Sequence, residues 1–594
     1  MQARSTLTTT LNTAPPVSKW VLPLFGLLLC LPFLVPIHDM PLPSFYSEGL
    51  ALLLGLAALL VWLYRSPWQE IPQIVIAPLA LLLVVLLQLA LGMFAYRATA
   101  LIMVLFLAWC SLLMLAGRSL ASAFGVPRLL TCLAWYMLAG GVLNGLCGLL
   151  QYGNLWQGFA GWVAAPVDEA GAGVYGNVAQ QNHFATHLAL ALAAASYLCF
   201  TRQLHRALYA GACLLLFAAL MLSASRSSLL YLLWIIALSL GLLTRAGLRQ
   251  QGRKVVMILL ALGLVLALVL GLVFALAGHG VPQIDRLMTL LGGLGVRAYL
   301  WRHAFAMFQS HPVLGVGFDA FAYHLVNQLH ALKEPSQWGI DQYAHNLWLQ
   351  LLAVSGLLGF LALFVPGALW LRRQWKVVYS TEQMLLWAWL GILLIHSMLE
   401  QPLYFSYFLG LAGLVLSLAE TKAVPAPPGL RRAGLVVVVL GLALLFKTGY
   451  EYDQLESYFY SQRAMNGPEA LHKRAQIAKA LQRYSLLAPL VELAAPAEFV
   501  PDSATPEAKI AFNQPVRHFA PVAETEYREA ALLAEAGRVQ AAQDQFDRAA
   551  YAYPGQTKVY LPRFFALAES DPEHYEALAA HAREFVLKMH GKLD

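Results

Sequence analysis

The chain has few charged residues for its length. Only 12% of its 594 residues are Asp, Glu, Lys or Arg, whereas 59% are hydrophobic, and the mean hydropathy is +0.62. A chain of this length would normally suggest several soluble domains, but this composition excludes that class and indicates a membrane protein. The formal net charge of +7 is not gathered into a basic stripe interleaved with aromatic residues. We therefore expect no nucleic-acid partner.

Zinc-type cysteine pairs, carboxylate clusters and phosphate-binding loops are also missing. The six cysteines lie in or beside apolar segments, so disulfides and cysteine–metal sites are not expected. Asp and Glu are sparse before Tyr450, and no P-loop motif is present. These absences predict that the protein works without a bound divalent metal ion or cofactor.

Apolar runs of membrane-spanning length dominate the first 450 residues and predict about thirteen transmembrane helices. They are found near Trp20–Pro36, Tyr46–Tyr64, Ile74–Phe94, Ala98–Ala116, Leu129–Gln151, His183–Phe200, Ala207–Leu222, Leu229–Leu243, Val255–Ala277, Asn346–Leu371, Met384–Leu399, Tyr404–Leu418 and Ala433–Tyr450. The first run lacks a convincing cleavage site, so we interpret it as a retained anchor.

The loops between these runs differ in charge, which predicts the orientation of the protein. One set of alternate loops, with the N-terminus, holds Arg4, Lys19, Arg65, Arg118, Arg128, Arg202, Arg206, Arg245, Arg249, Arg253, Lys254, Arg372, Arg373, Lys376, Lys422, Arg431 and Arg432. The other set holds only Arg97, Arg226, Arg286, Arg297, Arg302 and Lys333. The basic loops should face the cytoplasm. In a bacterium, the C-terminal region would then lie in the periplasm.

The pattern predicts four segments: transmembrane helices in 1–277, a large periplasmic loop in 278–345, further transmembrane helices in 346–450 and a polar periplasmic tail in 451–594. Within the tail, one stretch resembles a single tetratricopeptide repeat, with the residues of its second helix and its turn at the expected offsets. These residues are Gly537, Ala542, Phe546, Ala549 and Pro554. A generic helical hairpin is the alternative, because the same periodicity allows it.

His345 precedes Asn346, where an apolar helix is expected to begin on the outer face. Asn346 or a neighbour can cap this helix, and the free N–H groups and helix dipole make the site locally positive. A histidine there should be biased toward its neutral form, which is the form that a general base needs. The alternative is an interfacial histidine that only anchors the helix.

Two arginines on the outer face are candidate ligands for phosphate. Arg226 occupies the serine-rich turn 223–228, and Arg297 lies with Trp301 on a helix expected at 296–309. Arginine with hydroxyl donors suits phosphate oxygens. Snorkelling or solvated arginines are the alternative.

Two further polar clusters lie at outer ends of apolar runs. The first consists of Gln180, Gln181, Asn182 and His183. The second consists of Glu400, Gln401 and Tyr404. The first could cap a helix or contact a sugar or an acceptor.

Several of these motifs together resemble a known family, the O-antigen ligase and polymerase superfamily. They are Gly295-Val-Arg297 with Trp301, His311-Pro-Val-Leu-Gly-Val-Gly-Phe318 and Tyr343-Ala-His345-Asn346-Leu-Trp348. The helical tail and two other motifs are similar to its protein O-oligosaccharyltransferase branch, the PglL-like, pilin-glycosylating enzymes. Those motifs are Gln180-Gln-Asn-His183 and Glu400-Gln-Pro-Leu-Tyr404.

The resemblance implies a helical membrane glycosyltransferase of the GT-C type in the inner membrane. It would transfer an oligosaccharide from undecaprenyl diphosphate to a Ser or Thr hydroxyl of an exported protein, with inversion and without a metal ion. His345 would deprotonate or orient the hydroxyl, and Arg226 and Arg297 would hold the diphosphate. The residues implied to position the acceptor or sugar are Gln180, which keeps the Gln-x-Asn-His spacing, Asn182, His183 and Tyr404.

Two other functions remain open at this point. Within the superfamily, the chain could attach O-antigen to lipid A-core or polymerise repeat units, although a repeat-like tail more often engages a protein. A transporter of the lipid-linked sugar is more distant, since the spans show no inverted repeat and almost no charges at mid-span.

Overall fold

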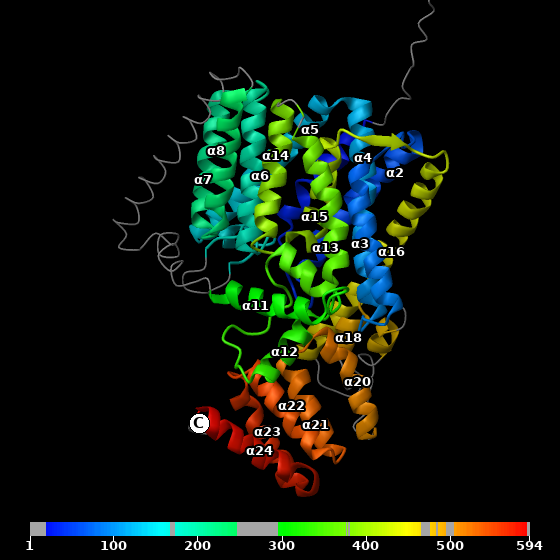
Figure 1. Cartoon of the computed structure of the whole chain (residues 1–594). Helices are drawn as coiled ribbons and strands as arrows, with labels where there is room; N and C mark the ends of the chain where they lie inside the picture. The colour runs from blue at the N-terminus through cyan, green and yellow to red at the C-terminus, as the bar shows by residue number, and fades with distance from the viewer. Residues whose placement is uncertain are drawn as a thin grey trace, which may run out of the picture.

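The computed structural model describes residues 19–166, 173–245, 295–375, 377, 380–464, 476–482, 485–494 and 504–590, and these fold almost entirely as helices. Figure 1 shows a tall helical bundle with a smaller group of helices below it. Within the described ranges, the only strands that pair are β1 (Glu70–Pro72) and β2 (Ala423–Pro425), which form an antiparallel ribbon. The all-α fold expected from the sequence is therefore confirmed, with the short β-ribbon as an addition.

The bundle is built from the apolar runs. Seven helices of the described part are long and apolar enough to cross a membrane: α2 (Phe45–Arg65), α3 (Ile76–Ala90) with the preceding turn η2 (Gln73–Val75), α4 (Arg97–Phe124), α5 (Val126–Tyr152), α6 (Gln181–Phe200), α13 (Leu347–Gln374) and α16 (Leu430–Ala464). Shorter helices of the bundle are α7 (Arg206–Leu222), α8 (Ser227–Arg245), α14 (Thr381–Ser397) and α15 (Ser406–Ala419). The run expected at 255–277 lies outside the described residues, so the predicted count of about thirteen stays a prediction.

The first apolar run is not the single helix that hydropathy predicts. It forms α1 (Val21–Leu28), a turn and the short 3₁₀ helix η1 (Leu31–Leu34). The physical reason is Pro32, which lacks a backbone donor and disfavours helical backbone at the residue before it. The prediction of one continuous spanning helix here was therefore wrong.

Helix α6 forms the centre of the bundle. Every residue from His183 to Leu198 is buried. Close approach to α5 depends on glycine, since a Cβ at Gly141 would lie 2.2 Å from the Cβ of Ala191. Small residues at such contacts let membrane helices pack backbone to backbone. Near the start of α6, a Cβ at Gly148 would likewise lie 2.7 Å from the ring of Phe184, so the close packing extends to the end of the helix that carries Asn182.

Helix α13 is interrupted at Gly356, whose φ of 60° and ψ of −157° are accessible essentially only to glycine. The segment 312–317 fills the break. The amides of Leu357 and Leu358 donate to the carbonyls of Pro312 and Val313, at 2.8 and 3.2 Å. Backbone groups at membrane depth need such partners. The motif that begins at His311 is therefore a structural fastening between an outer loop and a membrane helix.

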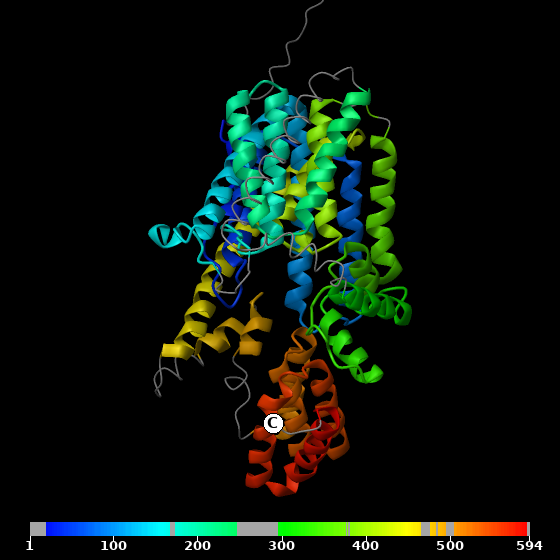
Figure 2. The same ribbon diagram turned by 90° about the vertical axis from the view of Figure 1, so that its left-hand side faces the viewer.

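The end of the bundle with the β-ribbon carries the basic loops. There the side chain of Glu420 is fully buried and accepts a hydrogen bond of 2.7 Å from Arg373, while Arg118 donates to Glu70 at 2.7 Å. The opposite end carries α11 (Gly295–Ser310), α12 (Phe321–Leu332) and the tail (Figures 1 and 2). The helix expected at 296–309 is confirmed by α11.

The tail is helical, as expected. It contains α18 (Ala488–Ala494), α20 (Pro506–Phe519), α21 (Ala523–Glu535), α22 (Val539–Ala552), α23 (Thr557–Ser570) and α24 (Pro572–His590). Gly537 has a φ of 72° in the turn between α21 and α22, and three residues of α22 are completely buried in the hairpin: Ala542, Phe546 and Ala549. α16 continues beyond Tyr450 to Ala464, so the last apolar run leads into the tail without a break.

The tail packs against α12. Tyr323 stacks on His518 with ring centroids 4.7 Å apart, and the Arg548 guanidinium lies 4.8 Å from the Tyr323 ring. The backbone amide of Ser336 also donates to the carbonyl of Tyr551 at 2.7 Å. These contacts connect the tail to the same outer loop that is fastened to α13.

Candidate active site

His345 is held at the start of α13 by local backbone structure. Its φ of 49° is left-handed, a conformation uncommon for non-glycine residues. Asn346 is the N-cap, as expected, since its side-chain oxygen accepts from the amides of Trp348 and Leu349 at 3.1 and 3.2 Å. The cap and the turn together direct the imidazole toward the end of α14.

The imidazole lies between two carboxylates, which the sequence analysis did not expect. Nδ1 is 2.7 Å from Glu400 Oε2, and Nε2 is 2.8 Å from Asp341 Oδ2. Burial alone would lower the pKa of His345, but the hydrogen bonds and charges of Asp341 and Glu400 outweigh it and raise the pKa to about 9. The prediction of a bias toward neutral histidine was therefore wrong, because the two carboxylates dominate over the helix dipole.

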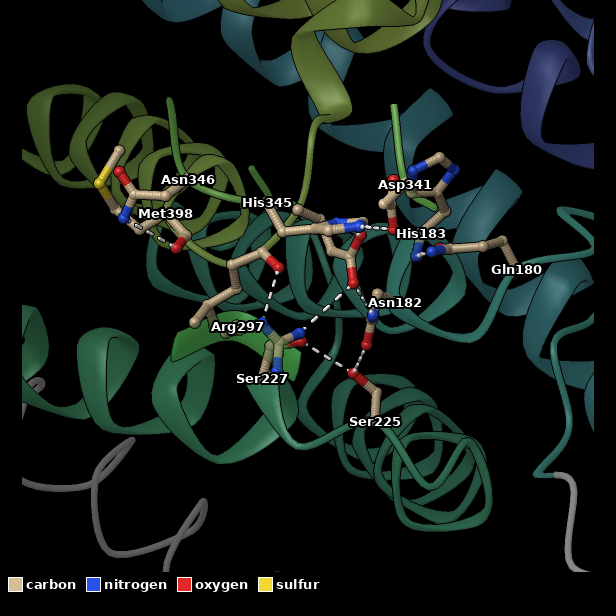
Figure 3. Close-up of polar contacts among 12 residues, drawn as sticks. Gln180, Asn182, His183, Ser225, Ser227, Arg297, Asp341, His345, Asn346 and Met398 are labelled. Atoms are coloured by element: carbon tan, nitrogen blue, oxygen red, sulfur yellow. Dashed lines mark hydrogen bonds and ion pairs between the residues drawn. The ribbon is translucent and has the colours of Figure 1, made fainter. Parts of the chain in front are cut away.

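Glu400 connects His345 to two of the other expected site residues. Its Oε1 accepts from Asn182 Nδ2 at 2.8 Å and lies 3.4 Å from a guanidinium nitrogen of Arg297. Arg297 also donates through Nε to the carbonyl of Leu399 at 3.2 Å. Figure 3 shows Asn182, Arg297 and His345 converging from separate segments. The site is thus assembled around one carboxylate.

The serine-rich turn adjoins this assembly. Ser225 donates to Asn182 Oδ1 at 2.7 Å, and its hydroxyl lies 2.8 Å from that of Ser227 (Figure 3). Arg226 lies between these two serines and is half-buried. The structure therefore brings the turn that carries Arg226 to the side of the site formed by Asn182 and Glu400.

The side chains of Gln180 and His183 take part mainly in helix capping and in core packing. Gln180 is the N-cap of α6 and accepts from the amide of His183 at 2.6 Å. The His183 ring is buried among aromatic side chains, 4.5 Å from Phe405 and 5.1 Å from Phe408 between ring centroids. Their proposed contact with a sugar or an acceptor stays a prediction, and in this conformation neither side chain contacts His345.

Tyr404 lies closer to His345. It ends the 3₁₀ turn η4 (Pro402–Tyr404), its ring centroid is 4.7 Å from that of Tyr343, and both tyrosines line a pocket beside His345. The pocket has a volume of about 20 Å³, which is room for one water molecule. A sugar or peptide could therefore enter only if these side chains move.

Two residues of the site were not predicted, Asp341 and Glu400. Asp341 precedes His345 by four residues, a spacing that could have signalled it, and Glu400 was noted only as part of a motif. In the part of the chain that the structure describes, no three His, Cys, Asp or Glu side chains are grouped as a metal site requires. The polar groups that are present suit an anionic ligand with a hydroxyl nucleophile nearby.

Replacing Arg297 by lysine should reduce the reaction rate, because lysine keeps the charge but cannot donate to Leu399, Glu400 and a ligand with one planar group. Arg302 offers a matched control on the same helix, since it contacts Glu334 at 2.6 Å and is more exposed. We expect Arg297→Lys to lower turnover more than Arg302→Lys at equal membrane abundance. Equal rates for the two variants would indicate that Arg297 has only a structural role.

Comparison with known proteins identifies two related family models. The O-antigen ligase family model matches residues 211–364, which include Arg226, Arg297 and His345. A second model, described as the C-terminal part of a virulence factor membrane-bound polymerase, matches residues 384–560, which include Glu400 and much of the tail. These two matches support an enzyme of the O-antigen ligase superfamily.

A curated relative extends the comparison. The chain is 24% identical over 436 residues to the general O-oligosaccharyltransferase of Acinetobacter baylyi, and the match covers 71% of this chain and 75% of the relative. Together with the two family models, this match indicates a glycosyltransferase-type enzyme similar to the PglL-like enzymes of the O-antigen ligase superfamily, and the family resemblance seen in the motifs is confirmed.

Proposed function

We propose that the enzyme transfers an oligosaccharide from undecaprenyl diphosphate to a Ser or Thr hydroxyl of a periplasmic protein such as pilin. The observation that carries the proposal is the convergence of His345, Arg297 and Asn182 on Glu400, at the end of the bundle where the tail also lies. This arrangement offers cationic groups for a diphosphate and an imidazole for a hydroxyl within one site.

The reaction is a single displacement. The acceptor oxygen attacks the anomeric carbon, the bond from that carbon to the phosphate oxygen breaks, and the lipid diphosphate leaves with the electron pair. Arg297 and Arg226 stabilise the negative charge that grows on the leaving group. His345 takes the proton of the hydroxyl in its neutral form. Attack from the face opposite the leaving group inverts the anomeric centre.

The proposed location is the bacterial inner membrane, with the site facing the periplasm. It is supported by the basic loops at the other end of the bundle, where positive charges normally mark the cytoplasmic side. In that orientation the tail lies in the periplasm, and we propose that it is a tetratricopeptide-like domain that presents the acceptor protein. The α21–α22 hairpin, with Ala542, Phe546 and Ala549 buried, supports this assignment.

The acid–base role of His345 predicts a specific pH dependence. Since the two carboxylates raise the pKa of His345 to about 9, the imidazolium is the main form at neutral pH. A base must lose that proton, so kcat/KM should rise with pH until it levels near pH 9. Asp341→Asn removes one of the two charges and should move this rise to lower pH. A rate that falls as pH increases from 7 would indicate that the imidazolium is the active form.

Product analysis tests the function directly. The chain would be expressed with a lipid-linked glycan pathway, a pilin acceptor and lipid A-core in one cell, and each molecule would be examined for sugar. We expect glycan on a Ser or Thr of the protein. Glycan only on lipid A-core would support the ligase instead, and lengthening of the lipid-linked glycan alone would support a polymerase of the Wzy type.

A further inference from the structure

An apolar loop projects from the site end of the bundle. The segment 152–166 follows α5 and contains no Asp, Glu, Lys or Arg. Within it, the 3₁₀ turn η3 (Trp156–Phe159) and its flanks expose large apolar side chains. Trp162 is 81% exposed and Leu155 is 62% exposed. Figure 2 shows this segment, in cyan, extending sideways from the bundle rather than along its axis.

The base of the loop is fixed, so its exposure is not the result of a poorly packed connection. Gln151 donates to the carbonyls of Ala164 and Gly176 at 2.9 and 2.7 Å. Asn177 donates to the carbonyl of Trp162 at 2.7 Å, and its side-chain oxygen accepts from the amide of Ala164 at 3.0 Å. Both amide side chains are buried and fully engaged. The exposed residues are therefore presented outward from a rigid support.

The exposed surface continues an apolar face of α5. Trp135, Leu143 and Leu146 are exposed along this helix, which is long and apolar enough to cross a membrane. Beyond Tyr152 the same kind of surface extends onto the loop. Aromatic side chains at the ends of spanning helices prefer the interface between lipid and water, and uncharged apolar turns are compatible with the headgroup boundary.

We propose that residues 152–163 form a membrane-interface anchor, inserted into the leaflet on the site side of the bilayer. A lipid surface fits better than a protein partner because the apolar surface is continuous with that of a spanning helix and because the segment 152–166 itself contains no Asp, Glu, Lys or Arg. The side chains that would enter the lipid are Tyr152, Leu155, Phe159 and Trp162.

The anchor also sets the depth of the active site. Gln151 and Asn177 connect its base to the segment 173–180, and this segment leads directly into Asn182, which contacts Glu400. This step rests on the proposed function. A diphosphate attached to a membrane lipid lies at headgroup level, so the anchor would hold the residues that bind it at the same level.

The position of the loop can be measured without any assay of transfer. An environment-sensitive fluorescent amino acid would replace Trp162 in the full-length chain, reconstituted in bilayers that contain spin-labelled lipids. We expect a blue-shifted emission that is quenched more by labels near the headgroup than by labels at the chain end, because an interfacial segment enters only about 5–10 Å. The matched control is the same probe in place of Val559, which is exposed on α23 of the tail.

Two results would overturn the anchor. The first is a probe at position 162 that soluble iodide quenches as strongly as the control, which would place the loop in water. The second is a probe that is shielded from iodide but not quenched by any lipid label, which would indicate a protein partner or a second copy of the chain. A parallel probe at Leu155 guards against a local disturbance at position 162.

The effect on the active site is tested separately. Leu155→Glu with Phe159→Glu should lower the rate with a lipid-linked donor in bilayers and leave the rate with a water-soluble donor analogue unchanged. An equal loss with both donors would mean that the variant is damaged and that the anchor does not set the depth. If the unmodified enzyme transferred no glycan at all, the proposed function would fail while the fluorescence result would still decide whether the loop is an anchor.

Discussion

The variant His345→Ala is expected to lose glycan transfer, with a rate about 10²–10⁴-fold lower, the usual contribution of a positioned acid–base side chain. The reason is the location of the imidazole, which contacts Glu400 at 2.7 Å and Asp341 at 2.8 Å while facing the small pocket with Tyr404. The measurement is transfer of glycan to an acceptor peptide by purified enzyme at saturating donor.

Removal of the imidazole leaves Asp341 and Glu400 without their shared partner, so stability must be measured as well. His345→Gln keeps an amide donor for one carboxylate but cannot accept a proton, and it should be as inactive as the alanine variant. His311→Ala is the matched control, since His311 is exposed in the loop after α11. Activity of either His345 variant near that of the control would exclude His345 as the base.

The second large effect is expected at Glu400. Replacing it by glutamine keeps one acceptor oxygen but removes the charge that faces His345 and Arg297. We expect the transfer rate to fall about 10²-fold, which is the lower end of the range for acid–base groups. The effect is smaller because Glu400 acts indirectly, by orienting His345 and Arg297 and by favouring the protonated form of His345. The lost carboxylate should also lower the pKa of His345, so the remaining activity should reach its plateau at lower pH than in the unmodified enzyme.

Glu334→Gln serves as the control for that experiment. Glu334 accepts a hydrogen bond of 2.6 Å from Arg302, which lies on α11 like Arg297, but this pair is outside the site. A purely structural role of Glu400 would lower thermal stability and abundance without moving the pH profile. An unchanged profile in Glu400→Gln would therefore contradict the role assigned here, whatever the size of the rate loss.

Local sequence predicted much of the architecture. The helical membrane fold, α11 and the cap at Asn346 were expected from patterns that span a few residues, and each depends on short-range physics such as periodicity and capping. The break near Pro32 was missed because hydropathy measures composition and does not register the end of a helix. The extent of α16 was missed for the same reason.

The site itself was predicted in part. His345, Arg297 and Asn182 were predicted from polar motifs on the outer face, and the structure brings these three together. The role of Glu400 could not be inferred, because it lies 55 positions from His345. The two residues meet only where the start of α13 lies beside the segment that follows α14, to which Asn346 donates at the carbonyl of Met398. The prediction of a neutral His345 was wrong for the same reason, since the protonation state of His345 depends on that contact.

The fastening of the outer loop to α13 has a consequence for acceptor choice. The segment 312–317 is bonded into the break at Gly356, the loop continues into α12, and α12 packs on the tail through Tyr323. The tail is therefore connected to His345 through α12, the segment 312–317 and α13. An acceptor held on the tail would meet the site at a fixed reach, so we expect the number of residues between its docking segment and its hydroxyl to select it more strongly than the sequence around that hydroxyl.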